Sequence, residues 1–251
     1  MRNRSLLLLV AAGTAVVWAA SGELRWPARA LLSALLLPIP FLLVYQAREL
    51  GRVTELPRLP VYASSAVAQW LLAAVTLLAA RAGGFTAVAL GLGPPHSWSV
   101  QLAWAAGLTA AGVGIMLASH ALGLRESGVL SELLPRTRGE RAAFVGLSVT
   151  AGVCEELVFR GFLIAALLTA TASLPLALLL SSLAFGMVHA YQEPGGVARA
   201  TLLALLLAAP LVLTGSLVAP VLAHTAIDVV GGLWLGERLT RGAADAPRRP
   251  E

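Results

Sequence analysis

Six long runs of the chain contain no Asp, Glu, Lys or Arg, and they constrain the fold more than any other feature. The runs cover residues 5–22, 30–47, 59–80, 82–124, 161–192 and 200–227. A membrane-spanning helix needs about 20 mostly apolar residues, so several runs are long enough to cross a bilayer. Only 12% of the 251 residues are charged, against about 25% in a typical soluble protein. The sequence therefore predicts an integral membrane protein and argues against a soluble, disordered or nucleic-acid-binding chain.

Breaks in the apolar pattern divide the chain into about eight transmembrane helices, which predicts an all-α polytopic membrane helix bundle. Gly and Pro residues at 91–95 precede the fourth helix, and Ser173 and Pro175 mark the start of the sixth, as turn and helix-start signals do. The predicted helices cover residues 5–21, 30–47, 60–80, 99–122, 141–168, 175–191, 199–213 and 217–236. We divide the chain into N-terminal transmembrane helices (1–138), core helices that carry the candidate site (139–238) and a disordered tail (239–251).

The distribution of arginine predicts that both termini lie inside. The chain has 18 basic residues and all are Arg; with the N-terminus inside, 14 lie in inner segments, three in outer segments and one, Arg160, within a span. Basic residues favour cytoplasmic loops. Arg2, Arg4 and the apolar stretch after them also resemble a cleavable secretory signal, but this stretch is long for a signal and we favour a retained helix. The absence of Lys and the richness in Ala, Arg, Gly and Leu favour a bacterial cell membrane.

Ionisable side chains within the predicted spans are the strongest functional signal, because charge at bilayer depth is costly and usually functional. The candidates lie on three different predicted helices. The six candidates are Glu155, Glu156, Arg160, His189, His224 and Asp228; His120, at the end of the fourth predicted helix, has no polar partner at helical spacing and is interpreted as structural. We expect the six candidates to converge on one cavity near the middle of the membrane, with the cytoplasmic face favoured for access.

Helical spacing distinguishes the two adjacent glutamates. Glu156 and Arg160 are four residues apart and can form an ion pair on one helix face. Glu155 points elsewhere and has no cation on its own helix, which suits a general base acting near neutral pH. His224 and Asp228 have the same four-residue spacing, so they can present two ligands to a metal ion or a water molecule. An alternative is that the charged residues form a buried network that only holds the helices together.

Three motifs in this order resemble the CPBP family of intramembrane proteases, also called the Abi or CAAX protease family, which includes the Rce1-type CAAX prenyl endopeptidases. The first, EExxxR, corresponds to Glu155, Glu156 and Arg160. The second, FxxxH, corresponds to Phe185 and His189. The third, HxxxN or HxxxD, corresponds to His224 and Asp228. The resemblance covers roughly residues 140–236, and each motif lies on a separate apolar helix.

The resemblance implies a membrane-embedded endopeptidase that hydrolyses a peptide bond of a peptide or membrane-protein substrate. By position, it implies that Glu155 activates a water molecule and that His189 and His224 bind the water or a metal and stabilise the oxyanion. Glu156, Arg160, Phe185 and Asp228 would support the site. A divalent metal ion, with zinc as the candidate, would be bound by His189, His224 and Asp228. The resemblance leaves open whether the substrate carries a prenyl group, and no nucleic-acid partner is expected because the arginines lie in short loops beside the predicted spans.

Two other functions remain open on the sequence alone. The chain could be a non-catalytic scaffold or bacteriocin-immunity protein that keeps the polar cavity for folding, or a transporter that uses it as an ion site, although we find no internal repeat. Other intramembrane protease chemistries fit poorly. The sequence has no His-Glu-x-x-His motif, and its only aspartates are Asp228 and Asp245, the latter in the predicted tail. A glutamate-dependent peptidase is the interpretation that we favour.

Overall fold

The computed structural model describes residues 2–50, 56–124 and 127–239, and in this part of the chain it contains helices and turns but no strand. The α-helices are α1 (Arg2–Ala20), α2 (Trp26–Leu36), α3 (Pro38–Leu50), α4 (Arg58–Gly83), α5 (Trp98–Ala121), α6 (Gly128–Leu133), α7 (Arg138–Glu155), α8 (Ile164–Thr171), α9 (Leu174–Val188), α10 (Glu193–Thr214), α11 (Val218–Val230) and α12 (Gly236–Leu239). Two π-helical segments, η1 (Glu156–Leu163) and η3 (Gly231–Leu235), and a 3-10 turn, η2 (Ala190–Gln192), join some of them. The predicted all-α class is confirmed. The predicted tail lies almost entirely outside the described residues.

Five helical segments are long and apolar enough to cross a membrane among the residues described. They are Trp26–Glu49, Arg58–Gly83, Trp98–Ala121, Ala190–Thr214 and Val218–Leu235, and two shorter apolar helices cover Arg4–Ala20 and Leu174–Val188. The protein is therefore a polytopic membrane helix bundle. Each of the eight predicted segments coincides with helix, whereas the number of spans and their direction stay predictions.

Two predicted helices differ in detail from the observed ones. The segment 30–47 is divided at Leu37 into α2 and α3, because Pro38 and Pro40 lack the backbone N–H that a continuous helix would need. Helix α10 begins at Glu193, six residues before the predicted start at 199, and Pro194 occupies its first turn. Proline is well tolerated there because the first-turn N–H groups have no partner within the helix.

The segment that carries the EExxxR motif is a continuous helix with a π-helical centre. Helix α7 ends at Glu155, η1 follows directly, and α8 continues to Thr171. All eight residues of η1 are buried. Ser181 of α9 donates a hydrogen bond of 2.7 Å from its hydroxyl to the Phe159 carbonyl, a backbone group within the π-helical turn. Such π-helical turns are rare and frequently occur at functional sites.

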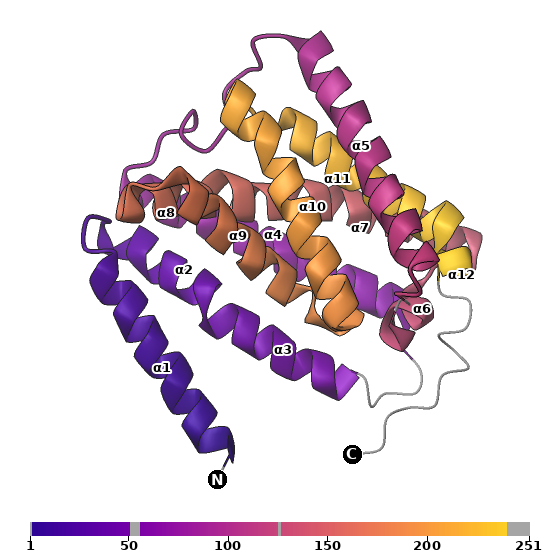
Figure 1. Cartoon of the computed structure of the whole chain (residues 1–251), viewed down its shortest axis with the longest axis horizontal. Coiled ribbons are helices and arrows are strands. Elements are labelled where there is room, and N and C mark those ends of the chain that lie inside the picture. The colour runs from indigo at the N-terminus through magenta and orange to yellow at the C-terminus, as the bar shows by residue number, and fades with distance from the viewer. Residues whose placement is uncertain (1, 51–55, 125–126, 240–251) are drawn as a thin grey trace.

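Two glycines allow the helices of the core to approach closely. Helix α7 packs against α4 and α11, and α9 packs against α10 (Figure 1). A methyl group added at Gly152 of α7 would lie 2.9 Å from the Val221 carbonyl oxygen of α11. A methyl group at Gly186 of α9 would lie 2.9 Å from the Val197 carbonyl oxygen of α10. Small residues at such contacts are typical of packed membrane helices.

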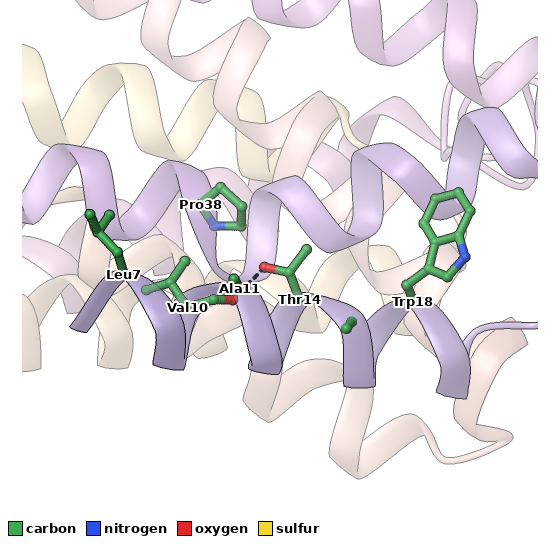
Figure 2. Close-up of a pocket in the computed structure, with 7 residues that line it drawn as sticks. Leu7, Val10, Ala11, Thr14, Trp18 and Pro38 are labelled. Atoms are coloured by element: carbon green, nitrogen blue, oxygen red, sulfur yellow. Dashed lines mark hydrogen bonds between the residues drawn. The ribbon is translucent and has the colours of Figure 1, made fainter. Parts of the chain in front are cut away.

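Helix α1 packs against α2 and α3 at the edge of the bundle and leaves an apolar groove between them. Arg29 of α2 fixes the end of α1, because its Nε donates a 2.5 Å hydrogen bond to the Trp18 carbonyl and its guanidinium lies 4.4 Å from the Trp18 ring centre. The groove is lined by Leu7, Val10, Ala11, Thr14, Ala15, Trp18 and Pro38 (Figure 2). It contains none of the candidate site residues.

Candidate active site

The six candidate residues named from the sequence form one connected cluster in the structure. Glu155 is the last residue of α7, and Glu156 and Arg160 lie in η1. His189 follows the last residue of α9. His224 and Asp228 lie on α11, which packs against α7. The packing of α11 against α7 and of α9 against η1 therefore brings the residues of three separate motifs together.

Glu156 lies at the buried centre of a small cluster, where its carboxylate contacts the Arg160 guanidinium and the His224 imidazole. Its side chain is 0% exposed, and its Oε2 lies 3.2 Å from Arg160 Nε. Its Oε1 lies 2.7 Å from His224 Nδ1. The predicted pair between Glu156 and Arg160 is thus present. The contact with Glu156 also orients His224, so that its Nε2 faces away from η1 and toward Glu155.

Phe185 connects the three motifs through its ring and its backbone. The Arg160 guanidinium carbon lies 4.2 Å from the Phe185 ring centre, and the ring centres of His189 and His224 lie 4.5 and 5.8 Å from it. The Phe185 carbonyl accepts a 2.9 Å hydrogen bond from His189 Nδ1. This bond directs His189 Nε2 toward the cluster, while the phenylalanine side chain itself contributes the ring contacts with Arg160, His189 and His224.

Glu155 has one carboxylate oxygen in a hydrogen bond and one without a partner. Oε1 accepts a 2.8 Å hydrogen bond from Gln69 Nε2 of α4. Oε2 is buried, has no hydrogen-bond partner, and faces the Nε2 atoms of His189 and His224 at 4.0 and 3.8 Å. Buried polar atoms are nearly always hydrogen-bonded, so this oxygen marks the place where a water molecule or a substrate atom would bind.

Asp228 lies at the open side of the cluster. Its Oδ2 is 3.7 Å from His224 Nε2, and its side chain is 35% exposed, whereas the side chains of Glu155 and His189 are 16% and 15% exposed. Glu156 and Arg160 are almost fully buried. Exposure therefore increases from the Glu156 side to the Asp228 side, and a ligand would approach from the latter.

Sequence reasoning did not identify Gln69 as part of the site. It lies in an apolar span, and its partner Glu155 is 86 positions away on another helix. The only available signal was an amide side chain within the charge-free run 59–80. Polar residues are expected to face the bundle interior at such depth, but this alone does not say which residue they contact.

The suitability of the site for a metal ion can be judged from the donor atoms. His189 and His224 both use Nδ1 in a hydrogen bond and direct Nε2 into the cluster, as histidine metal ligands commonly do. In the described part of the chain, however, no group of three or more His, Cys, Asp and Glu side chains is arranged to hold a metal ion. The described geometry therefore offers two imidazole nitrogens that face one space, without a third side chain arranged to complete a metal site.

Fold and site together define a polytopic helical membrane protein with a buried carboxylate and imidazole cluster. Residues 137–230 match the family model described as type II CAAX prenyl endopeptidase Rce1-like, and this segment contains all three motifs. The match confirms the resemblance to the CPBP and Rce1-type proteases over this part of the chain. Comparisons with curated proteins and with solved structures gave no match.

Proposed function

We propose that the protein is a membrane-embedded endopeptidase in which Glu155 activates the water molecule that attacks the peptide bond. The observation that carries the proposal is the buried, unpartnered Oε2 of Glu155, which faces the Nε2 atoms of two histidines at 4.0 and 3.8 Å. A water molecule can lie within hydrogen-bond distance, about 3 Å, of Oε2 and of either Nε2.

The proposed reaction needs one proton carrier and one group that stabilises negative charge. Glu155 Oε2 takes a proton from the water as the water oxygen bonds to the peptide carbonyl carbon, which makes a tetrahedral oxyanion. The carbon–nitrogen bond then breaks, and Glu155 returns the proton to the leaving amine nitrogen. An imidazole that carries a proton at Nε2 donates a hydrogen bond to the oxyanion. His189 and His224 are the two candidates, and Glu156, Arg160 and Phe185 hold them in place. Because the Nδ1 atoms of the two rings already donate to the Phe185 carbonyl and the Glu156 carboxylate, the ring that donates from Nε2 is an imidazolium, protonated on both nitrogens.

A divalent metal ion at His189, His224 and Asp228, with zinc as the candidate, stays a prediction. If one is bound, its chemistry would be to lower the pKa of a bound water and to polarise the carbonyl. The measurement is the metal content of the purified protein by mass spectrometry, compared between the wild type and His224→Ala. Stoichiometric metal that is lost in the variant would support the prediction, and equal, trace amounts in both would contradict it.

The proposed function is tested with the purified protein and a farnesylated peptide that ends in a CAAX sequence, alongside the same peptide without the prenyl group. The family description makes the prenylated peptide the first substrate to try. We expect cleavage by the wild type and by Glu132→Gln, whose side chain is 41% exposed in a surface ion pair. We expect loss of at least about 100-fold in kcat for Glu155→Gln, since acid–base catalysis contributes about 10²–10⁴-fold.

A second experiment covers substrates other than prenylated peptides. Membrane proteomes of cells with the wild type and with Glu155→Gln would be compared for altered peptide termini. The peptidase proposal is wrong if the two kinds of cell give the same termini and purified Glu155→Gln cleaves the CAAX peptides as fast as the wild type. A scaffold or immunity protein would then be the better interpretation, because such a role should survive a nearly isosteric change.

A further inference from the structure

Gln69 is a polar side chain in a span whose neighbours face lipid. Trp70 and Leu71 are 53% and 63% exposed, as expected for residues on the outer surface of a membrane helix, while Gln69 is directed toward α7. Burying an amide in an apolar environment costs free energy unless its hydrogen bonds are made. A glutamine here therefore needs a compensating contact, and its contact is the carboxylate at the centre of the candidate active site.

The Gln69 amide makes a hydrogen bond to Glu155 and leaves its other polar atom unsatisfied. Its Nε2 donates to Glu155 Oε1 at 2.8 Å. Its own Oε1 is buried and has no hydrogen-bond partner among the described residues. A residue whose role was to join helices by hydrogen bonding would be expected to use both ends of its amide. Gln101 of α5 does so, since it donates to Thr214 Oγ1 at 2.9 Å and accepts from the Ala219 backbone N–H at 3.1 Å.

Helices α4 and α7 also pack together without this bond. Ala73, one turn after Gln69, forms a buried apolar cluster with Cys154 and Leu157, the residues that flank the glutamate pair. This packing already holds the two helices side by side. The hydrogen bond from Gln69 adds control over the rotation of one carboxylate, because a fixed Oε1 determines where Oε2 can lie.

We propose that Gln69 is a positioning residue for Glu155: its amide holds Oε1 so that Oε2 faces the Nε2 atoms of His189 and His224. The expected effect on the rate rests on the proposed peptidase function. The contact between Gln69 and Glu155 does not depend on that function. A carboxylate freed from Gln69 can rotate away from the histidines. A misplacement of about 1 Å in a reacting group can cost on the order of 100-fold in rate.

The kinetic test compares Gln69→Leu, Gln69→Asn and Gln101→Leu with the wild type, using the farnesylated CAAX peptide. We expect kcat to fall about 10- to 100-fold for Gln69→Leu, with KM within about twofold of the wild type. Gln69→Asn should be similarly slow, because its shorter side chain does not reach Glu155. Gln101→Leu should lose thermal stability but keep its kcat per folded molecule. A wild-type kcat in Gln69→Leu, or a loss no greater than that of Gln101→Leu, overturns the proposal.

A second measurement does not depend on activity. The Tm of the full-length protein in detergent is compared for Gln69→Leu, Glu155→Leu and the double variant. We expect Gln69→Leu to lower the Tm because it strands a buried carboxylate oxygen, and the double variant to recover that loss, since replacing both partners by apolar groups can be nearly neutral. If the two changes in Tm simply add, Gln69 does not hold Glu155 and the inference is wrong. If they are coupled but the wild type cleaves no peptide, the contact stands and the proposed function fails.

Discussion

Glu155 and Glu156 are adjacent, chemically identical residues that the fold places in different surroundings. Glu156 is fully buried and contacts Arg160 and His224. Glu155 is 16% exposed, contacts Gln69, and keeps one oxygen facing two imidazoles. The difference arises because one helix position turns each side chain toward a different neighbour. One glutamate can thereby hold the site together while the other remains available for chemistry.

Replacing Arg160 by Ala should destabilise the protein, because it leaves Glu156 as a buried carboxylate without a cation. Breaking a buried pair typically costs about 3–5 kcal/mol of unfolding free energy. The measurement is the Tm and the abundance of the purified variant. Arg136→Ala is the matched control, because the Arg136 side chain is 63% exposed and its pair with Glu132 should contribute at most about 1 kcal/mol. Equal losses in the two variants would contradict a stabilising role for the buried pair.

The sequence was sufficient to identify the residues of the cluster but not the contacts of Glu155. Spacing of four residues predicts the Glu156–Arg160 pair because both side chains lie on one helix. The approach of Glu155 to His189 and His224 follows from packing between helices, which spacing within a single helix does not determine. Gln69 was missed for the same reason. Contacts between distant helices depend on small residues such as Gly152, whose importance is visible only when the neighbouring backbone is known.

At the level of helices, Gly152 determines how closely α7 approaches α11. Gly152→Ala should displace α11 and lower activity, because a methyl group there would meet Thr225 Oγ1 and the Val221 carbonyl oxygen of α11, next to His224. Overpacking of this kind typically costs about 1–3 kcal/mol. The measurements are the Tm and the cleavage rate per folded molecule.

Gly146 offers a matched control on the same helix. A methyl group at Gly146 would have no atom within 4 Å, so Gly146→Ala should keep the activity. It should also raise helix stability by about 0.5–1 kcal/mol, because alanine is the better helix former. If Gly152→Ala behaves like Gly146→Ala, then close packing of α7 and α11 is not what brings Glu155 to His224.

The first turn of α7 should give the protein a specific pH dependence. Glu140 accepts hydrogen bonds from the backbone N–H groups of Thr137 and Arg136 at 2.9 and 2.8 Å, and these bonds lower the pKa of Glu140 below its ordinary value of 4.5. Because the pKa is lower in the folded state, this stabilisation is present above pH 4.5. It is lost as the pH falls through the lower, folded-state value.

The measurement is the Tm of the wild type and of Glu140→Gln as a function of pH. The wild type should have the higher Tm near pH 7, and the two curves should converge as the pH falls below 4.5. Thr137→Ala is the control, because it removes the uncharged hydroxyl that accepts from the Glu140 N–H. Near pH 7 its Tm should lie below that of the wild type, as the Tm of Glu140→Gln does. A constant difference between wild type and Glu140→Gln at every pH would contradict a role for the carboxylate charge.

Sequence patterns predicted the α-helices of this protein but not its π-helical segment η1. Charge-free runs and Gly or Pro breaks predicted the helices to within a few residues in most cases, because burial in lipid demands long apolar segments. They did not predict the π-helical η1, whose cause is tertiary: all of its residues are buried, and Ser181 of another helix donates to the Phe159 carbonyl. An apolar pattern is compatible with both an α-helical and a π-helical turn.

The loops that are predicted to lie outside the membrane meet at one end of α4, and the loops that are predicted to lie inside meet at its other end. At one end, the Arg25 guanidinium lies near Gly84, and the Leu217 N–H donates to the Gly91 carbonyl at 3.0 Å. At the other end, Arg58 Nε donates to the Leu134 carbonyl at 2.9 Å. Each contact joins segments that the arginine distribution assigns to the same side of the membrane. The arrangement is therefore consistent with alternating spans.

The length of α9 indicates the side from which the site is reached. Its 15 residues extend about 22 Å at 1.5 Å per residue, less than the roughly 30 Å of the hydrocarbon core. If α9 begins at the outer surface, His189 and the turn η2 end within the inner half of the membrane. Non-helical backbone at that depth is tolerated where protein buries it or where it borders a water-filled cavity. The site should therefore open toward the inner side.

Cysteine labelling with a membrane-impermeant maleimide tests this orientation. Cys154 is the only cysteine and is 1% exposed, so the unmodified protein should not react and serves as the blank. We expect Gly139→Cys at the start of α7 and Tyr191→Cys in η2 to react in inverted vesicles, and Thr171→Cys at the end of α8 to react in right-side-out vesicles. If Tyr191→Cys reacts together with Thr171→Cys, the site opens to the outside. If Gly139→Cys also reacts only in right-side-out vesicles, the whole predicted topology is inverted, because these two positions mark the opposite ends of one continuous helix.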